Sequence, residues 1–208
     1  MSAEWFTAAV AGLADRDPQL RTLYLRNGVP PHWRRPPGFA SLTHIILEQQ
    51  VSLASAAAAF NRLYDRLEGE VGPGAFLQLG DIELREIGFS RQKGGYVRNL
   101  ATGITEGTID LAAVELMSDE DARVTLLGIQ GIGPWTAGIY LMFALDRPDV
   151  WPRGDRALHV AMAKALSLGS PPSSEEAAEM ARRWKPWRSA AARLLWHDYL
   201  GGPDVVPA

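Results

Sequence analysis

Asp155 has the setting of a residue that could take part in a hydrolytic reaction. It follows Gly154 and precedes the helical pattern ALHVAMAKAL at 157–166. An aspartate in that place commonly caps the helix by accepting a hydrogen bond from the first turn. The same carboxylate could also stabilise positive charge that develops while a bond breaks. The residues around Asp155 are needed to distinguish a capping role from a catalytic one.

Other kinds of catalytic site find little support in the sequence. The spacing of His159, four residues after Asp155, is compatible with a hydrolytic dyad, but no serine or cysteine nucleophile is evident. The four histidines show no spacing typical of a metal site. The absence of cysteine excludes disulfides, zinc–thiolate sites and a cysteine-ligated iron–sulfur cluster. Asp155 therefore remains the main candidate for chemistry.

A glycine-rich segment upstream, GIQGIGPWTA at 128–137, predicts a tight turn between two helices. Ser118 suits the N-cap of the helix before the turn, and Pro134 suits the first position of the helix after it. Gly131 and Gly133 allow positive φ and a close approach to the main chain. An ordinary helical hairpin explains this pattern. The alternative is a docking point for a phosphate oxygen.

Helical periodicity runs through most of the chain, and no segment shows a clear alternation of apolar and polar residues typical of a strand. The proline-rich stretch at 29–39 cannot be helical and is expected to cross the surface as an extended strap. The polar residues Glu48 to Ser52 interrupt an otherwise strong helical pattern. Helices are expected at 4–15, 17–26, in two pieces within 41–67, from 91, within 118–127, from Pro134, from Asp155, and on both sides of Lys185-Pro186.

Composition limits the class of protein. A chain of 208 residues that is 47% hydrophobic and contains 7 tryptophans can bury a core in one domain or two close lobes. The net charge of −3 argues mildly against indiscriminate nucleic-acid binding, although basic residues cluster at 91–98 and 182–193. Each cluster is either a solvated helix face or a modest phosphate footprint. Because the N-terminus lacks a basic segment and no apolar run could span a bilayer, we expect a cytoplasmic protein.

The string GIQGIGPWTA, together with Asp155, resembles the helix-hairpin-helix (HhH-GPD) superfamily of DNA glycosylases, and most closely its 3-methyladenine DNA glycosylase II branch. The resemblance extends from about Phe39 to near the C-terminus. It implies an all-α fold of two lobes with a cleft between them, without the N-terminal α/β domain of longer relatives. Lobe A would comprise 1–38 and 150–208. Lobe B would comprise 39–149, including the hairpin at 126–137.

The resemblance also implies roles for particular residues. Asp155 matches the essential carboxylate of the family, and Gln50 matches the residue that fills the gap left by a flipped nucleotide. Trp135 stands where members that also cut the backbone carry a lysine, so we expect hydrolysis alone. Its ring could stack on an alkylated purine or simply pack under the helix start. The base pocket is expected to include Trp135, Trp196 and Tyr140, and the DNA-binding residues to be Gly131, Ile132, Gly133, Thr136, Gln49, Gln50, Arg91, Lys93 and Arg153.

The function implied is that of a monofunctional glycosylase, which releases alkylated purines from double-stranded DNA and leaves an abasic site. The alternatives are a DNA-binding module without catalysis and a glycosylase for oxidised or deaminated bases. We expect a monomer that works in the cytoplasm, at the nucleoid in a prokaryote. No organic cofactor or side-chain metal site is expected. A monovalent cation on hairpin carbonyls is a trait of the resembled family.

Overall fold

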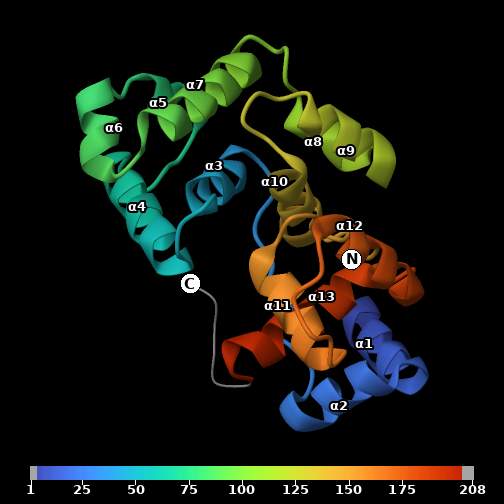
Figure 1. The fold of residues 1–208 in the computed structure, drawn as a ribbon. Coiled ribbons are helices and arrows are strands. Elements are labelled where there is room, and N and C mark those ends of the chain that lie inside the picture. The colour runs from blue at the N-terminus through green and yellow to red at the C-terminus, as the bar shows by residue number, and fades with distance from the viewer. Residues whose placement is uncertain (1–3, 203–208) are drawn as a thin grey trace. The chain divides into compact units, whose positions relative to one another are not determined.

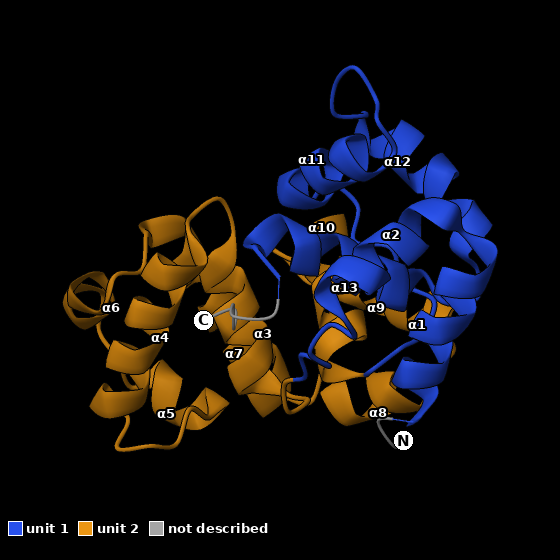
Figure 2. Ribbon diagram, turned by 90° about the horizontal axis from the view of Figure 1, so that it is seen from below, with its two compact units in different colours: residues 1–34, 146–207 blue, residues 35–145, 208 orange. Residues whose placement is uncertain are grey.

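The computed structural model describes residues 4–202 of the chain, and every regular element within them is a helix. This confirms the all-α fold expected from the periodicity. No helix in the described range is long and apolar enough to cross a membrane. The backbone divides into two compact units: unit 1 contains residues up to Arg34 and those from Asp146 onward, and unit 2 contains 35–145 (Figure 2). Both crossings between the units lie four residues before the boundaries expected from the sequence.

Unit 1 is built from both ends of the chain, so that blue and red segments lie side by side in Figure 1. Leu13, Leu20, Leu158 and Leu195 are fully buried in its core. Helices α1 and α2 pack on α13, which in turn packs on α11. The elements are α1 (Glu4–Arg16), α2 (Pro18–Asn27), α11 (Arg156–Ala165), α12 (Ser174–Met180), the 3-10 turn η2 (Ala181–Trp184) and α13 (Arg188–Leu200).

Unit 2 packs its longer helices around a separate apolar core. Leu42 and Ile46 of α3 are fully buried, as are Leu63 of α4 and Leu100 of α7. The α3 helix touches α4, α7 and α10. The elements are α3 (Phe39–Glu48), α4 (Leu53–Arg66), α5 (Pro73–Leu77), α6 (Asp81–Ile87), α7 (Arg91–Thr105), α8 (Leu111–Leu116), α9 (Asp119–Leu127), α10 (Pro134–Ile139) and the π-helical turn η1 (Tyr140–Ala144).

Several predicted helix starts are confirmed by their capping bonds. Asp17 accepts hydrogen bonds from the main-chain N–H groups of Gln19 and Leu20, with Pro18 in the first turn of α2. Ser52 caps α4 and Ser118 caps α9 in the same way. These bonds satisfy donors that the helix itself leaves unpaired. The helix after Pro134 differs from expectation, because it continues as a π-helical turn from Tyr140.

The proline-rich strap is held by buried acids. In unit 1, His32 Nε2 lies 2.7 Å from Asp146 Oδ1, and Arg34 lies 3.6 Å from the second carboxylate oxygen. Asp146 is 2% exposed and has φ of 54°. In unit 2, Arg35 donates to both oxygens of the buried Glu48. Arg34 and Arg35 of the strap therefore pair with buried acids, and His32 lies within hydrogen-bond distance of one of them.

Candidate functional site

Asp155 is the N-cap of α11 and is half-buried. Its Oδ1 accepts a hydrogen bond of 2.7 Å from the main-chain N–H of Leu158 and one of 3.2 Å from the indole N–H of Trp196. The capping role predicted for this aspartate is thus confirmed. The second donor comes from a different helix, α13. Two donors that converge on one oxygen restrict the rotation of the carboxylate.

The loop that leads to Asp155 is fastened at its start. Arg188 donates from Nε and Nη2 to the two carboxylate oxygens of Asp149, at 2.8 and 2.9 Å. Ser189 Oγ donates to the carbonyl of Arg147 and accepts from the N–H of Val150. Both anchoring residues are at the beginning of α13. The same helix therefore fixes the loop where it begins, at 147–150, and where it ends, at Asp155.

His159 offers no dyad with Asp155 in the structure. It is 9% exposed, and its Nε2 is buried without a hydrogen-bond partner among the described residues. Burial lowers the pKa of His159, an effect that the charge of Asp155 opposes. A neutral, buried imidazole is what core packing of this residue would produce.

The hairpin in unit 2 links α9 to α10 through a turn in which the two glycines differ. Gly131 has φ of 90°, and a Cβ at this position would lie 2.2 Å from Cγ of Tyr96. Gly133 caps α10 with φ of −90° and has open space where its Cβ would be. Ile132 is buried, and its N–H donates to the carbonyl of Ile129. Of the two glycines, Gly133 is the one that leaves room beside the main chain.

Gln49 joins the end of α3 to this hairpin. Its Nε2 lies 2.9 Å from the carbonyl oxygen of Gly131 and 2.9 Å from Oγ1 of Thr136. Thr136 is 2% exposed. Both residues were expected at the DNA, but their side chains bond to each other, which argues against direct contact through those groups. Gln50, by contrast, is exposed, in a left-handed conformation with φ of 58°.

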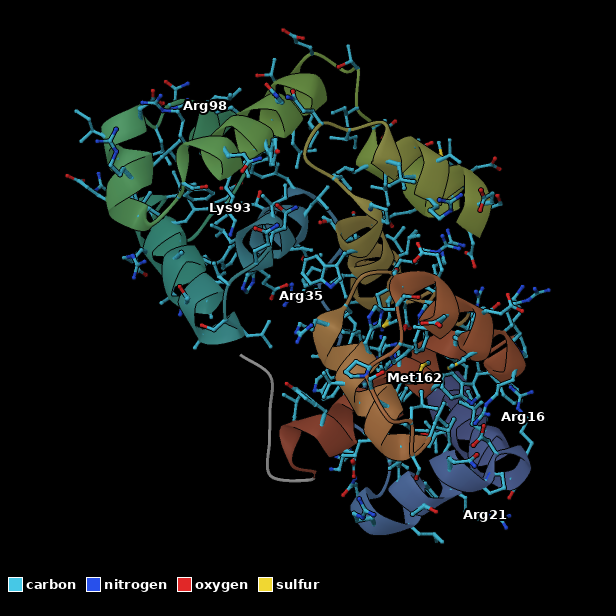
Figure 3. All side chains as sticks on the ribbon, viewed as in Figure 1. Arg16, Arg21, Arg35, Lys93, Arg98 and Met162 are labelled. Carbon is cyan, nitrogen blue, oxygen red and sulfur yellow. The ribbon has the colours of Figure 1, made fainter. Side chains whose placement is uncertain are left out.

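The basic residues at 91–98 differ in their exposure and in their hydrogen-bond partners. Lys93, labelled in Figure 3, donates from Nζ to the carbonyl oxygen of Leu47 at 2.6 Å. Burial lowers the pKa of this lysine. Arg98 donates to the carbonyl of Leu79 and pairs with Asp81. Arg91 is exposed in the first turn of α7. Of Arg91, Lys93 and Arg98, only Arg91 is exposed, as expected of a residue that contacts a ligand.

The basic cluster at 182–193 serves mainly internal pairs. Arg182 pairs with Glu179, Arg183 with Asp17, and Arg188 with Asp149. Arg193 is fully buried and donates to the carbonyls of Ser189 and Trp33. Burial lowers its pKa to about 9, so it stays charged at neutral pH. These internal pairs favour a structural role for the cluster over binding of DNA phosphates.

The three aromatic residues expected in a base pocket are placed differently. Trp135 is half-buried in the first turn of α10. Tyr140 is fully buried, and its hydroxyl accepts a hydrogen bond from the N–H of Gly38, with burial raising its pKa. Trp196 is 8% exposed. Arg153 lies exposed in the loop before Asp155.

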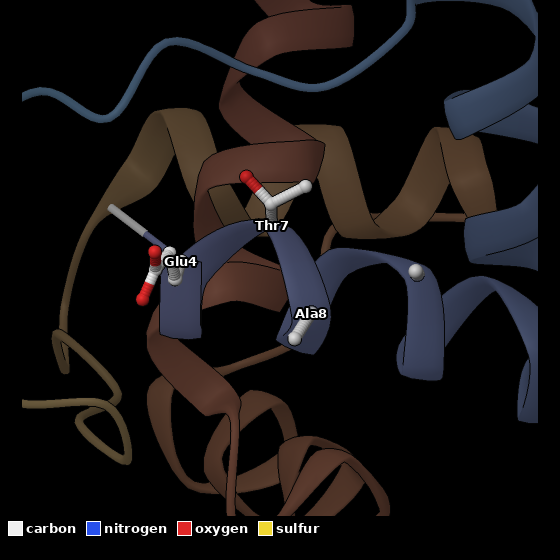
Figure 4. Close-up of a pocket in the computed structure, with 4 residues that line it drawn as sticks. Glu4, Thr7 and Ala8 are labelled. Carbon is white, nitrogen blue, oxygen red and sulfur yellow. The ribbon is translucent and has the colours of Figure 1, made fainter. Parts of the chain in front are cut away.

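Three further observations bear on ligands. The hairpin carbonyls of Ile129 and Gly131 accept hydrogen bonds from Ile132 and Gln49, so a cation bound there would share these oxygens. Among the described residues no group of three or more His, Cys, Asp or Glu side chains could hold a metal ion. An open depression on α1 (Figure 4) is lined by Glu4, Thr7, Ala8 and Ala11, which include none of the expected site residues.

Sequence reasoning missed the partners that hold these groups. Leu47 and Arg35 carry no catalytic motif, and they pair with Lys93 and Glu48, which lie 46 and 13 positions away. The ring of Tyr96 occupies the space that a side chain at position 131 would need. The bond between Arg188 and Asp149 joins segments that are 39 positions apart. Neither residue has a spacing or a motif that indicates this contact.

Comparison with known proteins agrees with this arrangement. The family model for the HhH-GPD superfamily matches residues 43–187, a range that contains the hairpin and Asp155. The Bacillus subtilis protein YfjP is 33% identical over 160 residues, which cover 74% of this chain and 56% of that protein. The alkylbase DNA glycosidase-like protein mag2 of Schizosaccharomyces pombe is 33% identical over 118 residues, which cover 56% of this chain and 55% of that protein. The chain thus spans little more than half the length of these relatives.

Among solved structures, the S. pombe 3-methyladenine DNA glycosylase Mag1 in complex with abasic DNA has a TM-score of 0.85 and 26% sequence identity to this chain. The match covers 91% of this chain and 95% of that one. The hairpin, the capping aspartate and these similarities lead to one conclusion. The chain belongs to the HhH-GPD superfamily of base excision DNA repair proteins.

Proposed function

We propose that this protein is a monofunctional DNA glycosylase, which hydrolyses the N-glycosidic bond of alkylated purines in double-stranded DNA. The observation that carries the proposal is Asp155, whose carboxylate stands in the aspartate position of the family motif with one oxygen held by two donors. The names of the relatives supply 3-methyladenine and alkylated bases as the lesion class, and we extend this class to 7-methylguanine type bases. Its place of action would be the cytoplasm, at the nucleoid in a prokaryote.

The reaction breaks the bond between C1′ of deoxyribose and the nitrogen of the base. The electron pair of that bond goes to the base, and positive charge builds on the sugar. The carboxylate of Asp155 stabilises this charge, which is present mainly in the transition state. Water then adds to C1′, and its proton passes to the carboxylate or to solvent. An alkylated purine already carries positive charge and leaves as a neutral base, so no general acid is required.

Unit 2 would hold the DNA. Gly133 offers open main chain at the start of α10, Gln50 is exposed in a left-handed turn, and Arg91 is exposed at the start of α7. We assign Gln49, Thr136 and Lys93 to positioning of these groups, because their polar atoms bond within unit 2. Arg153 in unit 1 would add a phosphate contact.

For the base we assign Trp135, whose broad ring is half-buried at the start of α10. Stacking of a cationic purine on an indole contributes about 1–2 kcal/mol. Tyr140 is withdrawn from the pocket, because it is buried and its hydroxyl bonds to the N–H of Gly38. Its role in this proposal is to hold the strap against η1.

The decisive experiment compares wild type with Asp155→Asn on duplex DNA that has been treated with a methylating agent, and measures released bases by chromatography. Asparagine caps a helix about as well as aspartate, so the variant keeps the fold and loses the charge. We expect base release to fall by about 10³-fold or more, while duplex binding remains.

Asp110→Asn is the matched control. Asp110 is also an N-cap, that of α8, and accepts from the N–H of Ala113 at 2.9 Å. Its replacement should leave base release unchanged. If wild type binds duplex DNA but releases no base, the protein is a binding module. If wild type acts only on oxidised or deaminated bases, the lesion class is wrong and the glycosylase assignment stands.

A second experiment with the wild-type protein tests for strand cleavage. Because Trp135 stands where backbone-cutting members carry a lysine, no amine is placed to form a Schiff base with the opened sugar. Abasic duplex DNA should stay intact at neutral pH, and borohydride should trap no covalent complex. A trapped complex would contradict the monofunctional assignment.

A further inference from the structure

Trp196 was expected to form a wall of the base pocket, but its position suggests a different role. The residue is 8% exposed, so little of its ring is available for stacking. Its Nε1 lies 3.2 Å from Oδ1 of Asp155. The same oxygen accepts the N–H of Leu158 at 2.7 Å.

A capping bond by itself leaves the carboxylate free to rotate about the bond between Cβ and Cγ. A second donor from another direction removes that freedom and sets the direction of the other carboxylate oxygen, Oδ2. Catalysis by a fixed charge depends on such orientation, since the carboxylate then needs no rearrangement while the positive charge develops.

The indole is itself well anchored. Trp196 belongs to α13, whose first residues Arg188 and Ser189 bind the loop at 147–150. Leu194 and Leu195, beside it, are almost completely buried. Because α13 also packs on α11, the donor and the acceptor stand on two helices in direct contact.

We propose that Trp196 is a positioning residue of the glycosylase reaction, which orients the carboxylate of Asp155 through its indole N–H. This inference rests on the proposed function. It assigns to Trp196 an effect on the chemical step that is independent of the base being released, whereas a wall of the base pocket would discriminate between bases.

The test is Trp196→Phe, which keeps an aromatic ring and removes the N–H. Single-turnover rates with enzyme in excess, measured over a range of enzyme concentration, separate the rate at saturation from the half-saturating concentration. We expect the saturated rate to fall roughly 10- to 100-fold, equally for 3-methyladenine and 7-methylguanine, with half-saturation nearly unchanged.

Trp184→Phe is the matched control. Trp184 is fully buried, and its Nε1 donates at 2.7 Å to Asp17, which caps α2 as Asp155 caps α11. Its replacement removes the same kind of bond away from Asp155. The saturated rate per folded molecule should stay within about two-fold of wild type.

If Trp196→Phe fails to fold, β-(3-benzothienyl)alanine at position 196 replaces the N–H by sulfur with nearly the same shape. A saturated rate equal to that of wild type in either variant would overturn the positioning role and leave the glycosylase assignment intact. If the loss of saturated rate differs between the two bases and the half-saturating concentration rises, Trp196 contacts the base as a wall of the pocket. If wild type releases no base while Asp155→Asn behaves identically, the proposed function fails, and this role fails with it.

Discussion

At the scale of single residues, the two glycines of the hairpin do different work. The main chain at Gly131 has positive φ, and the ring of Tyr96 fills the space that any side chain would need. At Gly133 the main chain is extended and the space is open. The first glycine serves the fold of unit 2, and the second leaves the main chain accessible.

Gly131→Ala should therefore destabilise the protein by about 2–4 kcal/mol, from backbone strain together with a clash against the base of the Tyr96 ring. Gly133→Ala should change the free energy of unfolding by less than about 0.5 kcal/mol and weaken duplex binding instead. Urea unfolding and a DNA-binding titration measure the two effects. Equal stability of the two variants would contradict the distinction.

At the scale of elements, the end of α3 is held by three side chains close to an expected DNA contact. Lys93 bonds to the carbonyl of Leu47, Arg35 pairs with Glu48, and Gln49 reaches the hairpin. The bonds at Glu48 and Gln49 stand directly before the exposed Gln50. A turn held in this way can present a side chain to a partner at little cost in conformational entropy.

Lys93 and Arg91, two residues apart at the start of α7, allow this to be tested. Arg91→Ala should reduce the slope of log affinity against log salt by about 0.9, the value for one phosphate contact. Lys93→Met should reduce that slope by less and instead cost about 1–2 kcal/mol of stability, because the Leu47 carbonyl loses its donor. If Lys93→Met instead reduces the slope by about 0.9 and leaves stability unchanged, Lys93 contacts a DNA phosphate.

At the scale of the whole molecule, all four histidines are harder to protonate in the folded chain than in the unfolded chain. Burial is the largest cause that lowers the pKa of His32, His44, His159 and His197 from the ordinary value of 6.5. Two of them lie at the strap or in α3, and two on the helices of unit 1 that form the Asp155 site. Their protonation is therefore coupled to folding of both units.

The sign of the effect follows from the lowered pKa. As the pH falls below 6.5 the unfolded chain takes up protons that the folded chain resists, so stability decreases until the folded pKa values are passed. Each histidine contributes up to about 1.4 kcal/mol per pH unit in that window. Urea unfolding at about pH 7.5 and about pH 5.5 measures the loss, and His197→Phe should lessen it. A stability that does not change between these two values would contradict the prediction.

The sequence by itself determined the local structure and the family motif. Capping residues such as Asp17, Ser52 and Asp155, and the helix-starting Pro134, act on main-chain groups within three residues of themselves, so their effects can be predicted from neighbours alone. The glycine pattern and Asp155 likewise form a motif that can be recognised without coordinates.

Only the tertiary structure decided which polar atoms are left for a ligand. Gln49, Lys93 and Trp196 all looked like contact residues, yet Gly131, Leu47 and Asp155 are their hydrogen-bond partners, between 41 and 82 positions away in the sequence. A polar side chain reads the same in a sequence whether it faces a substrate or a partner inside the protein. The physical reason is that a buried polar atom must be satisfied, and the fold alone determines which atoms meet.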